Sequence, residues 1–224
     1  MNGLEKERQV LVIFPHPDDE AFGVSGTIAL HIENNTPVTY ICMTLGEMGR
    51  NLGNPPFATR ESLPKIRKKE LQDAADALGL TDLRMWGLRD KTVEFEDDDK
   101  LTEKISEAIQ ELNPSLIISF YPGYSVHPDH EACARAVVRA VGQIEETKRP
   151  KLNLVAFANN SIAEIGEPDI LHDITAVEDK KIASIKAHRS QTESMVATWA
   201  EKMKNQDPTL LNAIRRERFW TYKF

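Results

Sequence analysis

Two short polar segments, far apart in the chain, hold the side chains best suited to chemistry. Residues 15–20 read PHPDDE, and residues 127–130 read HPDH. Two imidazoles and one carboxylate that leave coordination positions open form a ligand set for zinc in hydrolytic sites, or for ferrous iron. We expect zinc. An ion held there would lower the pKa of a bound water and polarise a carbonyl, so the pattern predicts metal-assisted hydrolysis of an amide or ester.

The adjacent carboxylates of the first segment indicate a division of labour. Asp18 and Asp19 cannot easily point the same way, so one would bind the ion while the other acts as general base toward water. Spacing leaves open whether His127 or His130 is the ligand. The spare histidine, when protonated, would hold the oxyanion of the tetrahedral intermediate. Taken alone, PHPDDE fits a helix N-terminus with a capping carboxylate equally well.

Other catalytic chemistries fit the sequence poorly. Residues 23–26, GVSG, lack the spacing of a serine-nucleophile elbow. The sequence has no P-loop, and no GxGxxG follows its first predicted strand. Cys42 and Cys133 lie in separate apolar segments, which predicts buried reduced thiols rather than a disulfide. Nucleotide and thiol chemistry are therefore disfavoured.

The elements that must position these segments alternate between strand and helix. Short apolar runs predict strands at residues 9–14, 38–44, 82–86, 115–120 and 152–158. Apolar residues three and four apart predict helices at residues 19–34, 61–79, 97–112 and 129–144. This alternation predicts one α/β domain over residues 1–224, a Rossmann-like, doubly wound, mostly parallel sheet with helices on both faces. The first and fourth strands can be neighbours at the switch point of such a sheet, which would bring PHPDDE and HPDH together.

The remaining segments are less regular. Residues 180–188 and 193–204 predict further helices, and residues 218–224 predict a terminal strand or a packed tail. The acidic stretch 94–99 is interpreted as the solvated start of a helix. Two long or polar connections, residues 46–62 and 121–127, follow predicted strands. Open α/β sheets keep their ligands on such loops.

Composition restricts the partners. The chain has 224 residues, 35 of them acidic and 28 basic, and its net charge of -7 comes without a long basic run. Nucleic acid is therefore not an expected partner. Its apolar runs are far shorter than the ~20 residues that cross a bilayer, so no membrane association is expected. The N-terminal MNGLEKER lacks the pattern of a signal peptide, so we expect a cytoplasmic protein.

At these segments the sequence resembles the LmbE-like (PIG-L) family of zinc-dependent N-acetylglucosamine deacetylases. The resemblance rests on PHPDDE, TLGEMG at residues 44–49, RKKEL at 67–71, HPDH and HRSQ at 188–191. It implies that the zinc ligands are His16, Asp19 and His130. It also implies Asp18 as the general base, and His127 as the oxyanion-stabilising group, with Asp129 tuning His127 by a hydrogen bond.

The resemblance also implies a set of substrate contacts. Glu47, Arg67 and Asp90 would contact sugar hydroxyls or the aglycone, and His188 belongs to the same set. Some family members carry a tyrosine two residues before the HPDH motif, where this chain has Ser125; Tyr124 stands one residue further back, and whether it takes part in catalysis is left open. An anionic aglycone would need basic groups nearby, such as Arg50, Arg67 or Arg89. By contrast, Glu70 is interpreted as the solvated partner of Arg67 in an i, i+3 pair.

Within the family, the chain is most similar to the bacillithiol-pathway branch, and its closing RFWTY, residues 218–222, also resembles that branch. Those members remove acetate from N-acetylglucosaminyl malate, and we expect this amino-sugar substrate here. A bacillithiol S-conjugate amidase is the alternative within enzymes, and a non-catalytic metal-binding protein is the alternative of another class. Family members assemble as trimers or hexamers, so a homo-oligomer is expected.

Overall fold

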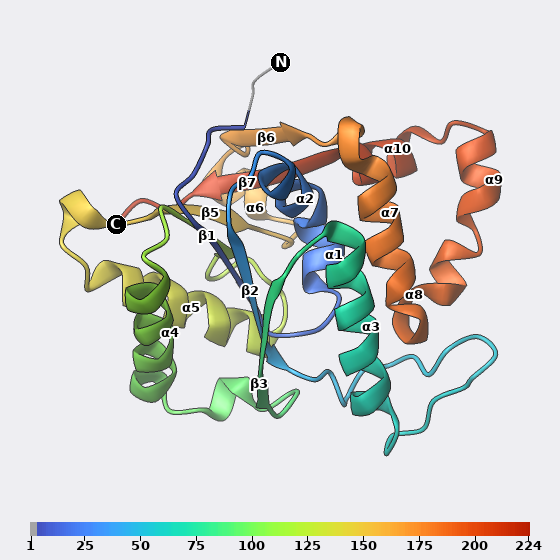
Figure 1. Cartoon of the computed structure of the whole chain (residues 1–224), viewed down its shortest axis with the longest axis horizontal. Helices are drawn as coiled ribbons and strands as arrows, with labels where there is room; N and C mark the ends of the chain where they lie inside the picture. The colour runs from blue at the N-terminus through green and yellow to red at the C-terminus, as the bar shows by residue number, and fades with distance from the viewer. Residues whose placement is uncertain (1–3) are drawn as a thin grey trace.

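A sheet of seven strands forms the centre of the molecule, in a computed structural model that describes residues 4–224 (Figure 1). The strands are β1 (Val10–Phe14), β2 (Val38–Thr44), β3 (Asp82–Leu88), β4 (Leu116–Phe120), β5 (Lys151–Val155), β6 (Ile170–Asp173) and β7 (Arg216–Thr221). Their order is β3-β2-β1-β4-β5-β7-β6. Neighbours from β3 to β5 are parallel, whereas β7 pairs antiparallel with β5 and β6. The predicted α/β class with a mostly parallel sheet is confirmed.

Helices cover both faces of this sheet (Figure 1). The helices are α1 (Asp19–Gly23), α2 (Ser25–Glu33), α3 (Leu63–Leu78), α4 (Asp98–Leu112), α5 (Pro128–Gly142), α6 (Ser161–Ile165), α7 (Glu178–Ala187), α8 (Arg189–Val196), α9 (Trp199–Lys204) and α10 (Pro208–Arg215). Short 3₁₀ turns occupy Val93–Phe95, Glu146–Lys148 and Thr175–Val177. In Figure 1, α4 and α5 lie on one side of the sheet and α2, α3 and α7 on the other. Within residues 4–224, none of the helices is long and apolar enough to cross a membrane.

The central strand β1 shows why the chain folds this way. All five of its residues are fully buried, because alternate side chains enter two different cores. Val12 belongs to the core that includes Ile28 of α2. Ile13 belongs to the other core, with Ile105 of α4. A strand buried on both faces has a continuous apolar sequence, which is the signal that predicted it.

Several predicted boundaries were wrong. The helix expected at residues 19–34 is divided into α1 and α2, because the Glu217 carboxylate accepts hydrogen bonds from Gly26 N at 2.9 Å and Thr27 N at 2.7 Å. That carboxylate comes from β7, so the break depends on a tertiary contact. The fifth strand ends at Val155 rather than at residue 158, and α6, β6 and α10 were not predicted. The terminal strand β7 begins at Arg216, two residues before its predicted start at residue 218.

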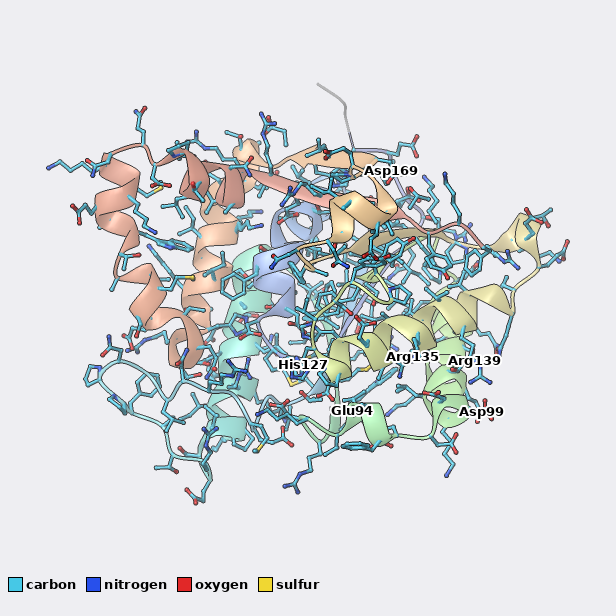
Figure 2. The ribbon with its side chains drawn as sticks, turned by 180° about the vertical axis from the view of Figure 1, so that it is seen from behind. Glu94, Asp99, His127, Arg135, Arg139 and Asp169 are labelled. Atoms are coloured by element: carbon cyan, nitrogen blue, oxygen red, sulfur yellow. The ribbon has the colours of Figure 1, made fainter. Side chains whose placement is uncertain are left out.

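The switch point of the sheet lies where it was predicted. β1 and β4 are adjacent and parallel, with Val10 paired to Leu116. PHPDDE follows β1, and HPDH follows the loop after β4, so both segments emerge at the same edge of the sheet. Figure 2 labels His127 at the beginning of α5. The loops after β2 and β3 open at this edge as well.

Candidate metal centre

Three side chains from the two segments converge at this edge. His16 Nδ1 lies 3.1 Å from His130 Nε2 and 3.6 Å from Asp19 Oδ2, and His130 Nε2 lies 3.3 Å from Asp19 Oδ1. Their side chains are between 10% and 13% exposed, so the group is nearly enclosed. The imidazole of His130 also stacks on Phe120 at the end of β4, with ring centroids 4.1 Å apart.

One ring nitrogen of each histidine already has a hydrogen-bond partner outside this group of three. His16 Nε2 lies 3.0 Å from Asp129 Oδ2 and 3.2 Å from Asp90 Oδ1. On the other ring, His130 Nδ1 donates to the Ser125 carbonyl at 3.0 Å. A histidine that donates from one nitrogen to a carboxylate or carbonyl presents the other nitrogen as a ligand. His16 Nδ1 and His130 Nε2 are therefore the available lone pairs, and they face each other and Asp19.

The spacing of these donor atoms fits a small divalent ion. Nitrogen and oxygen ligands about 2.0–2.2 Å from a tetrahedral zinc lie roughly 3.3–3.6 Å from one another. Of the three donor separations, which involve both oxygens of Asp19, 3.3 and 3.6 Å lie within that range and 3.1 Å lies just below it. Two other groupings bring their donor atoms within 4.8 Å: His16, His127 and His130, and His16, Asp90 and Asp129. The second grouping faces His16 Nε2, so it orients the imidazole from behind.

The electrostatics of the cluster also favour a cation. Burial works against a charged His16, but the carboxylates of Asp129, Asp19 and Asp90 outweigh burial and raise its pKa to about 12. Burial likewise works against an ionised Asp19, yet His130 and His16 hold the pKa of Asp19 below its usual value. A proton on His16 Nδ1, or a divalent ion in its place, would supply the positive charge that these three carboxylates favour.

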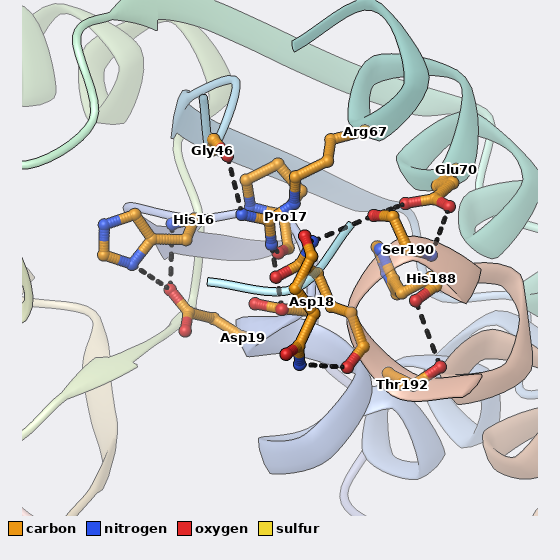
Figure 3. Close-up of polar contacts among 12 residues, drawn as sticks. His16, Pro17, Asp18, Asp19, Gly46, Arg67, Glu70, His188, Ser190 and Thr192 are labelled. Atoms are coloured by element: carbon orange, nitrogen blue, oxygen red, sulfur yellow. Dashed lines mark hydrogen bonds and ion pairs between the residues drawn. The ribbon is translucent and has the colours of Figure 1, made fainter. Parts of the chain in front are cut away.

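Asp18, next to Asp19 in sequence, contacts Arg67 and Glu20. Its Oδ2 lies 2.8 Å from Arg67 Nη2, and its peptide N–H donates to Glu20 Oε2 at 3.1 Å (Figure 3). The backbone of Asp18 has φ 102°, a left-handed conformation that costs a non-glycine residue about 1–3 kcal/mol. Burial raises the pKa of Asp18 despite the opposing Arg67 charge. Adjacent carboxylates therefore occupy different environments, and Asp18 is the better proton acceptor.

His127 caps α5 beside the cluster. Its Nδ1 accepts the Asp129 N–H at 3.2 Å, so the neutral ring carries its proton on Nε2. Burial lowers the pKa of His127, as do the nearby His16 and His130. The expected hydrogen bond between His127 and the Asp129 carboxylate is not formed among the described residues. Asp129 Oδ2 instead contacts His16 Nε2 at 3.0 Å and accepts the Lys91 N–H at 2.7 Å.

The expected substrate contacts separate into two groups. Asp90 is buried against His16, and its Oδ2 accepts the Met48 N–H at 2.8 Å. Glu47 lies half-buried, and its Oε2 has no hydrogen-bond partner among residues 4–224. Arg50 is exposed on the loop after β2. Tyr124 donates to Glu164 Oε2 at 3.0 Å on α6, so its hydroxyl is already engaged.

The residues of the other group are buried in the protein interior. Arg67 is 3% exposed and holds the carbonyls of Gly46 and Pro17 together with Asp18, so it positions the site rather than lining it. His188 is fully buried against Glu20, with Nε2 and Oε1 2.7 Å apart. Both side chains are buried in this structure, and their expected role as direct substrate contacts stays a prediction.

Glu70 also differs from expectation. It is 6% exposed, and its carboxylate accepts both the N–H and the hydroxyl of Ser190 at 2.7 Å. The i, i+3 pattern with Arg67 indicated a solvated pair, but a helix packed under α8 has no solvent on that face. Glu20 and Ser190 are the polar residues whose role was missed, although PHPDDE and HRSQ contain them.

Comparison with known proteins agrees with this geometry. Residues 11–141 match the PIG-L family, described as GlcNAc-PI de-N-acetylase. A Bacillus cereus protein named probable N-acetyl-alpha-D-glucosaminyl L-malate deacetylase 2 is 54% identical over 218 residues, which cover 97% of this chain and 99% of that protein. The protein of the same name from Bacillus subtilis is 49% identical over the same shares of each chain.

Solved structures show how widely the fold is used. The N,N'-diacetylchitobiose deacetylase of Pyrococcus horikoshii superposes with a TM-score of 0.75 at 22% identity, covering 99% of this chain and 86% of that one. The 4-carboxy-2-hydroxymuconate hydratase of Pseudomonas putida superposes with a TM-score of 0.71 at 21% identity over 97% of each chain. Fold alone therefore does not identify the reaction. The family match over more than half of the chain and the near full-length similarity to the Bacillus proteins identify this protein as a member of the PIG-L family of N-deacetylases.

Proposed function

We propose that this protein removes the acetyl group from N-acetyl-α-D-glucosaminyl L-malate, with His16, Asp19 and His130 holding a divalent ion. The observation that carries the site is the convergence of His16, Asp19 and His130, whose donor atoms lie 3.1–3.6 Å apart, with Asp18 next in sequence and paired with Arg67. The substrate follows from the names of the Bacillus relatives, which are similar over nearly the whole chain.

The chain supplies the proton transfers of amide hydrolysis. A divalent ion, when bound, supplies Lewis acidity toward water and the amide carbonyl. Asp18 takes the proton from the attacking water, and its raised pKa suits a base that must later return the proton. It then protonates the departing sugar nitrogen, which leaves acetate and a free amine as the products.

His127 is suited to the negative charge that develops during attack. Because Nδ1 accepts a backbone N–H, its Nε2–H is available as a donor even when the ring is neutral. A donor aimed at the oxygen of a tetrahedral intermediate lowers the barrier to attack. It typically raises kcat by a factor of about 10²–10³. In this proposal Asp129 acts on His16 instead of on His127.

The malate carboxylates need basic partners that are not already occupied. Arg67 is buried and already contacts Asp18. Arg50, on the loop after β2, and Arg89, directly after β3, are both exposed at the edge of the sheet where the site lies. We assign the anionic aglycone to these two side chains.

The test combines metal analysis with product analysis. Purified protein should contain about one divalent ion per chain and release free amine and acetate from N-acetylglucosaminyl malate. A chelator should abolish turnover, and zinc or ferrous iron should restore it, which also identifies the more active metal. A cysteinyl conjugate of the same sugar, tested in parallel, separates deacetylation from S-conjugate amidase activity. No product from fully metallated protein on either substrate would overturn the proposal.

Other expectations remain predictions. They are zinc as the resident metal, a single domain over residues 1–224, a homo-oligomer of trimeric or hexameric form, and a cytoplasmic location. Sedimentation of the purified protein tests the assembly directly.

A further inference from the structure

One turn, residues 188–192 at the start of α8, is connected to the general base by one chain of hydrogen bonds and by a second chain of contacts that includes helix α3 (Figure 3). It lies far along the sequence from Asp18. His188 and Ser190 provide the two starting points, and both are at most 1% exposed. Neither touches Asp18 directly, so any influence on the base passes through other residues.

The first chain reaches the backbone of Asp18. His188 Nε2 lies 2.7 Å from Glu20 Oε1, and Glu20 Oε2 accepts the Asp18 peptide N–H at 3.1 Å. The Tyr40 hydroxyl donates to the same Glu20 oxygen at 3.0 Å. Glu20 is 1% exposed, so water does not compete for its carboxylate. His188 Nδ1 has no partner among residues 4–224, which leaves the Glu20 contact as the ring's hydrogen bond.

The second chain reaches the side chain of Asp18. Ser190 donates its N–H and its hydroxyl to Glu70 of α3, both at 2.7 Å. Arg67 lies one turn earlier on the same helix, and its Nη2 contacts Asp18 Oδ2 at 2.8 Å. Arg67 Nη1 also donates to the Gly46 carbonyl at 3.0 Å, which fixes the guanidinium. Figure 3 shows Glu70, Ser190 and Arg67 in this arrangement.

We propose that residues 188–192 position Asp18 for catalysis, His188 by fixing its backbone and Ser190 by fixing the helix that holds its carboxylate. The left-handed backbone of Asp18, at φ 102°, persists only where the surroundings hold it. The peptide N–H on Glu20 and the carboxylate on Arg67 help to hold it, together with the Asp18 carbonyl, which accepts the Ala21 N–H at 3.0 Å and the Phe22 N–H at 3.2 Å. His188, Ser190, Glu20 and Glu70 are positioning residues, and the inference rests on Asp18 being the base of the proposed function.

The first experiment replaces His188 in two ways. His188→Leu removes the donor to Glu20, and kcat should fall about ten- to hundredfold, the size expected when a reacting group is misplaced by about 1 Å. His188→Gln keeps an N–H donor near the position of Nε2, and kcat should stay within about threefold of the parent. KM and metal content should be unchanged in both variants.

A matched control separates positioning from general damage to the core. His31 on α2 is also buried, at 1% exposure, and neither ring nitrogen has a partner among residues 4–224. It lines a cavity of about 330 Å³ with Glu7 and Leu116, at the opposite ends of the strands. His31→Leu should leave kcat and KM unchanged. A fall in kcat with this variant equal to that of His188→Leu would contradict the inference.

The second experiment is a double-mutant cycle with Asp18→Asn. If His188 acts through the base, His188→Leu should cost nothing further in kcat once Asp18 has lost its proton-accepting carboxylate. A purely structural role would lower kcat by the same factor in both backgrounds. Turnover that survives Asp18→Asn alone refutes the proposed function. A large Asp18→Asn effect with an additive or absent His188→Leu effect refutes the positioning role.

Ser190→Ala provides an independent arm should His188→Leu fail to fold. It removes the hydroxyl donor to Glu70 while the peptide N–H remains. We expect a smaller loss in kcat, about three- to tenfold, that again disappears in the Asp18→Asn background. A loss that persists in that background, or no loss in the parent, would contradict this half of the inference.

Discussion

At the scale of single residues, two adjacent carboxylates have acquired opposite properties. The histidines hold the pKa of Asp19 below its usual value, against the effect of burial, which suits a ligand that stays ionised. Burial raises the pKa of Asp18, against the effect of Arg67, which suits a base that takes up a proton. Backbone geometry separates the two, because φ 102° at Asp18 turns its side chain toward α3 while Asp19 begins α1.

Asp18→Asn tests this separation. The amide keeps the size of the side chain and an oxygen for Arg67, but it cannot accept the water proton. We expect kcat to fall at least about a hundredfold, the usual size of a general-base effect, with metal content unchanged. Asp73→Asn, a change at a partly exposed residue of α3, serves as the control and should leave kcat unchanged. Loss of the metal from the Asp18 variant would mean that the roles of the two carboxylates were assigned wrongly.

Arg50→Ala and Arg89→Ala test the recognition of the aglycone. Each should raise KM for N-acetylglucosaminyl malate about tenfold, the loss of one charge-assisted hydrogen bond, with little effect on kcat. A methyl N-acetylglucosaminide, which lacks both carboxylates, should show no such change. Steady-state kinetics on the two substrates give the comparison. Equal effects on both would place these arginines at the sugar instead.

At the scale of elements, the ends of the helices hold both structural and functional groups. His127 caps α5 with Nδ1, and that bond determines which nitrogen carries the proton. Asp97 caps α4 by accepting from Asp99 N and Lys100 N, both at 3.0 Å, far from the site. The predicted solvated helix start is confirmed there. In the proposed function the His127 cap also sets the proton on the oxyanion-stabilising ring, whereas the Asp97 cap contributes to stability alone.

Asp97→Ala should destabilise the protein without changing its activity. Loss of an N-cap acceptor costs about 1 kcal/mol of unfolding free energy. Asp98→Ala, in the first turn of the same helix, removes a comparable charge but leaves the cap in place. It should therefore lower the unfolding free energy by less than Asp97→Ala does. Denaturant unfolding of both variants measures the difference, and kcat should match the parent in each. Equal destabilisation by the two changes would assign the effect to charge rather than capping.

At the scale of the whole molecule, a buried neutral histidine links stability to pH. Burial lowers the pKa of His31 to about 4, assisted by the nearby His172 and opposed by Glu7. An unfolded histidine binds its proton near pH 6.5. Between these values the unfolded chain holds more protons at this position, so stability decreases as the pH falls from about 6.5 toward 4.

His31→Leu should remove this contribution. From its pKa values, His31 lowers the unfolding free energy of the parent by about 2 kcal/mol between pH 7 and pH 5. Between the same two pH values, the unfolding free energy of the variant should therefore decrease less than that of the parent. This comparison does not depend on the stability of the variant at pH 7. Urea unfolding at both pH values gives the four free energies. An identical pH dependence in parent and variant would show that His31 is protonated, or solvated, in the folded protein.

Sequence pattern predicted most of the parallel half of the sheet, because each of those elements has a local signal. A strand buried on both faces is apolar throughout, as at β1, and a helix such as α3 repeats its apolar residues every three or four positions. The same alternation allowed β1 and β4 to be neighbours at the switch point, which would bring PHPDDE and HPDH together. The antiparallel end, β6 and β7, has half-exposed or short strands with weaker signals.

The amino-acid sequence by itself determined the set of reactive groups, the α/β alternation and the family resemblance, because all three depend on residue type and spacing. Only the tertiary structure decided which groups reach the site and which are concealed. Arg67, Glu70 and His188 have the same polar side chains whether exposed or buried, and their burial depends on α3, α7 and α8 packing together. Contacts between distant segments, such as Ser190 with Glu70, leave no local signal because neither residue's neighbours in sequence require the other.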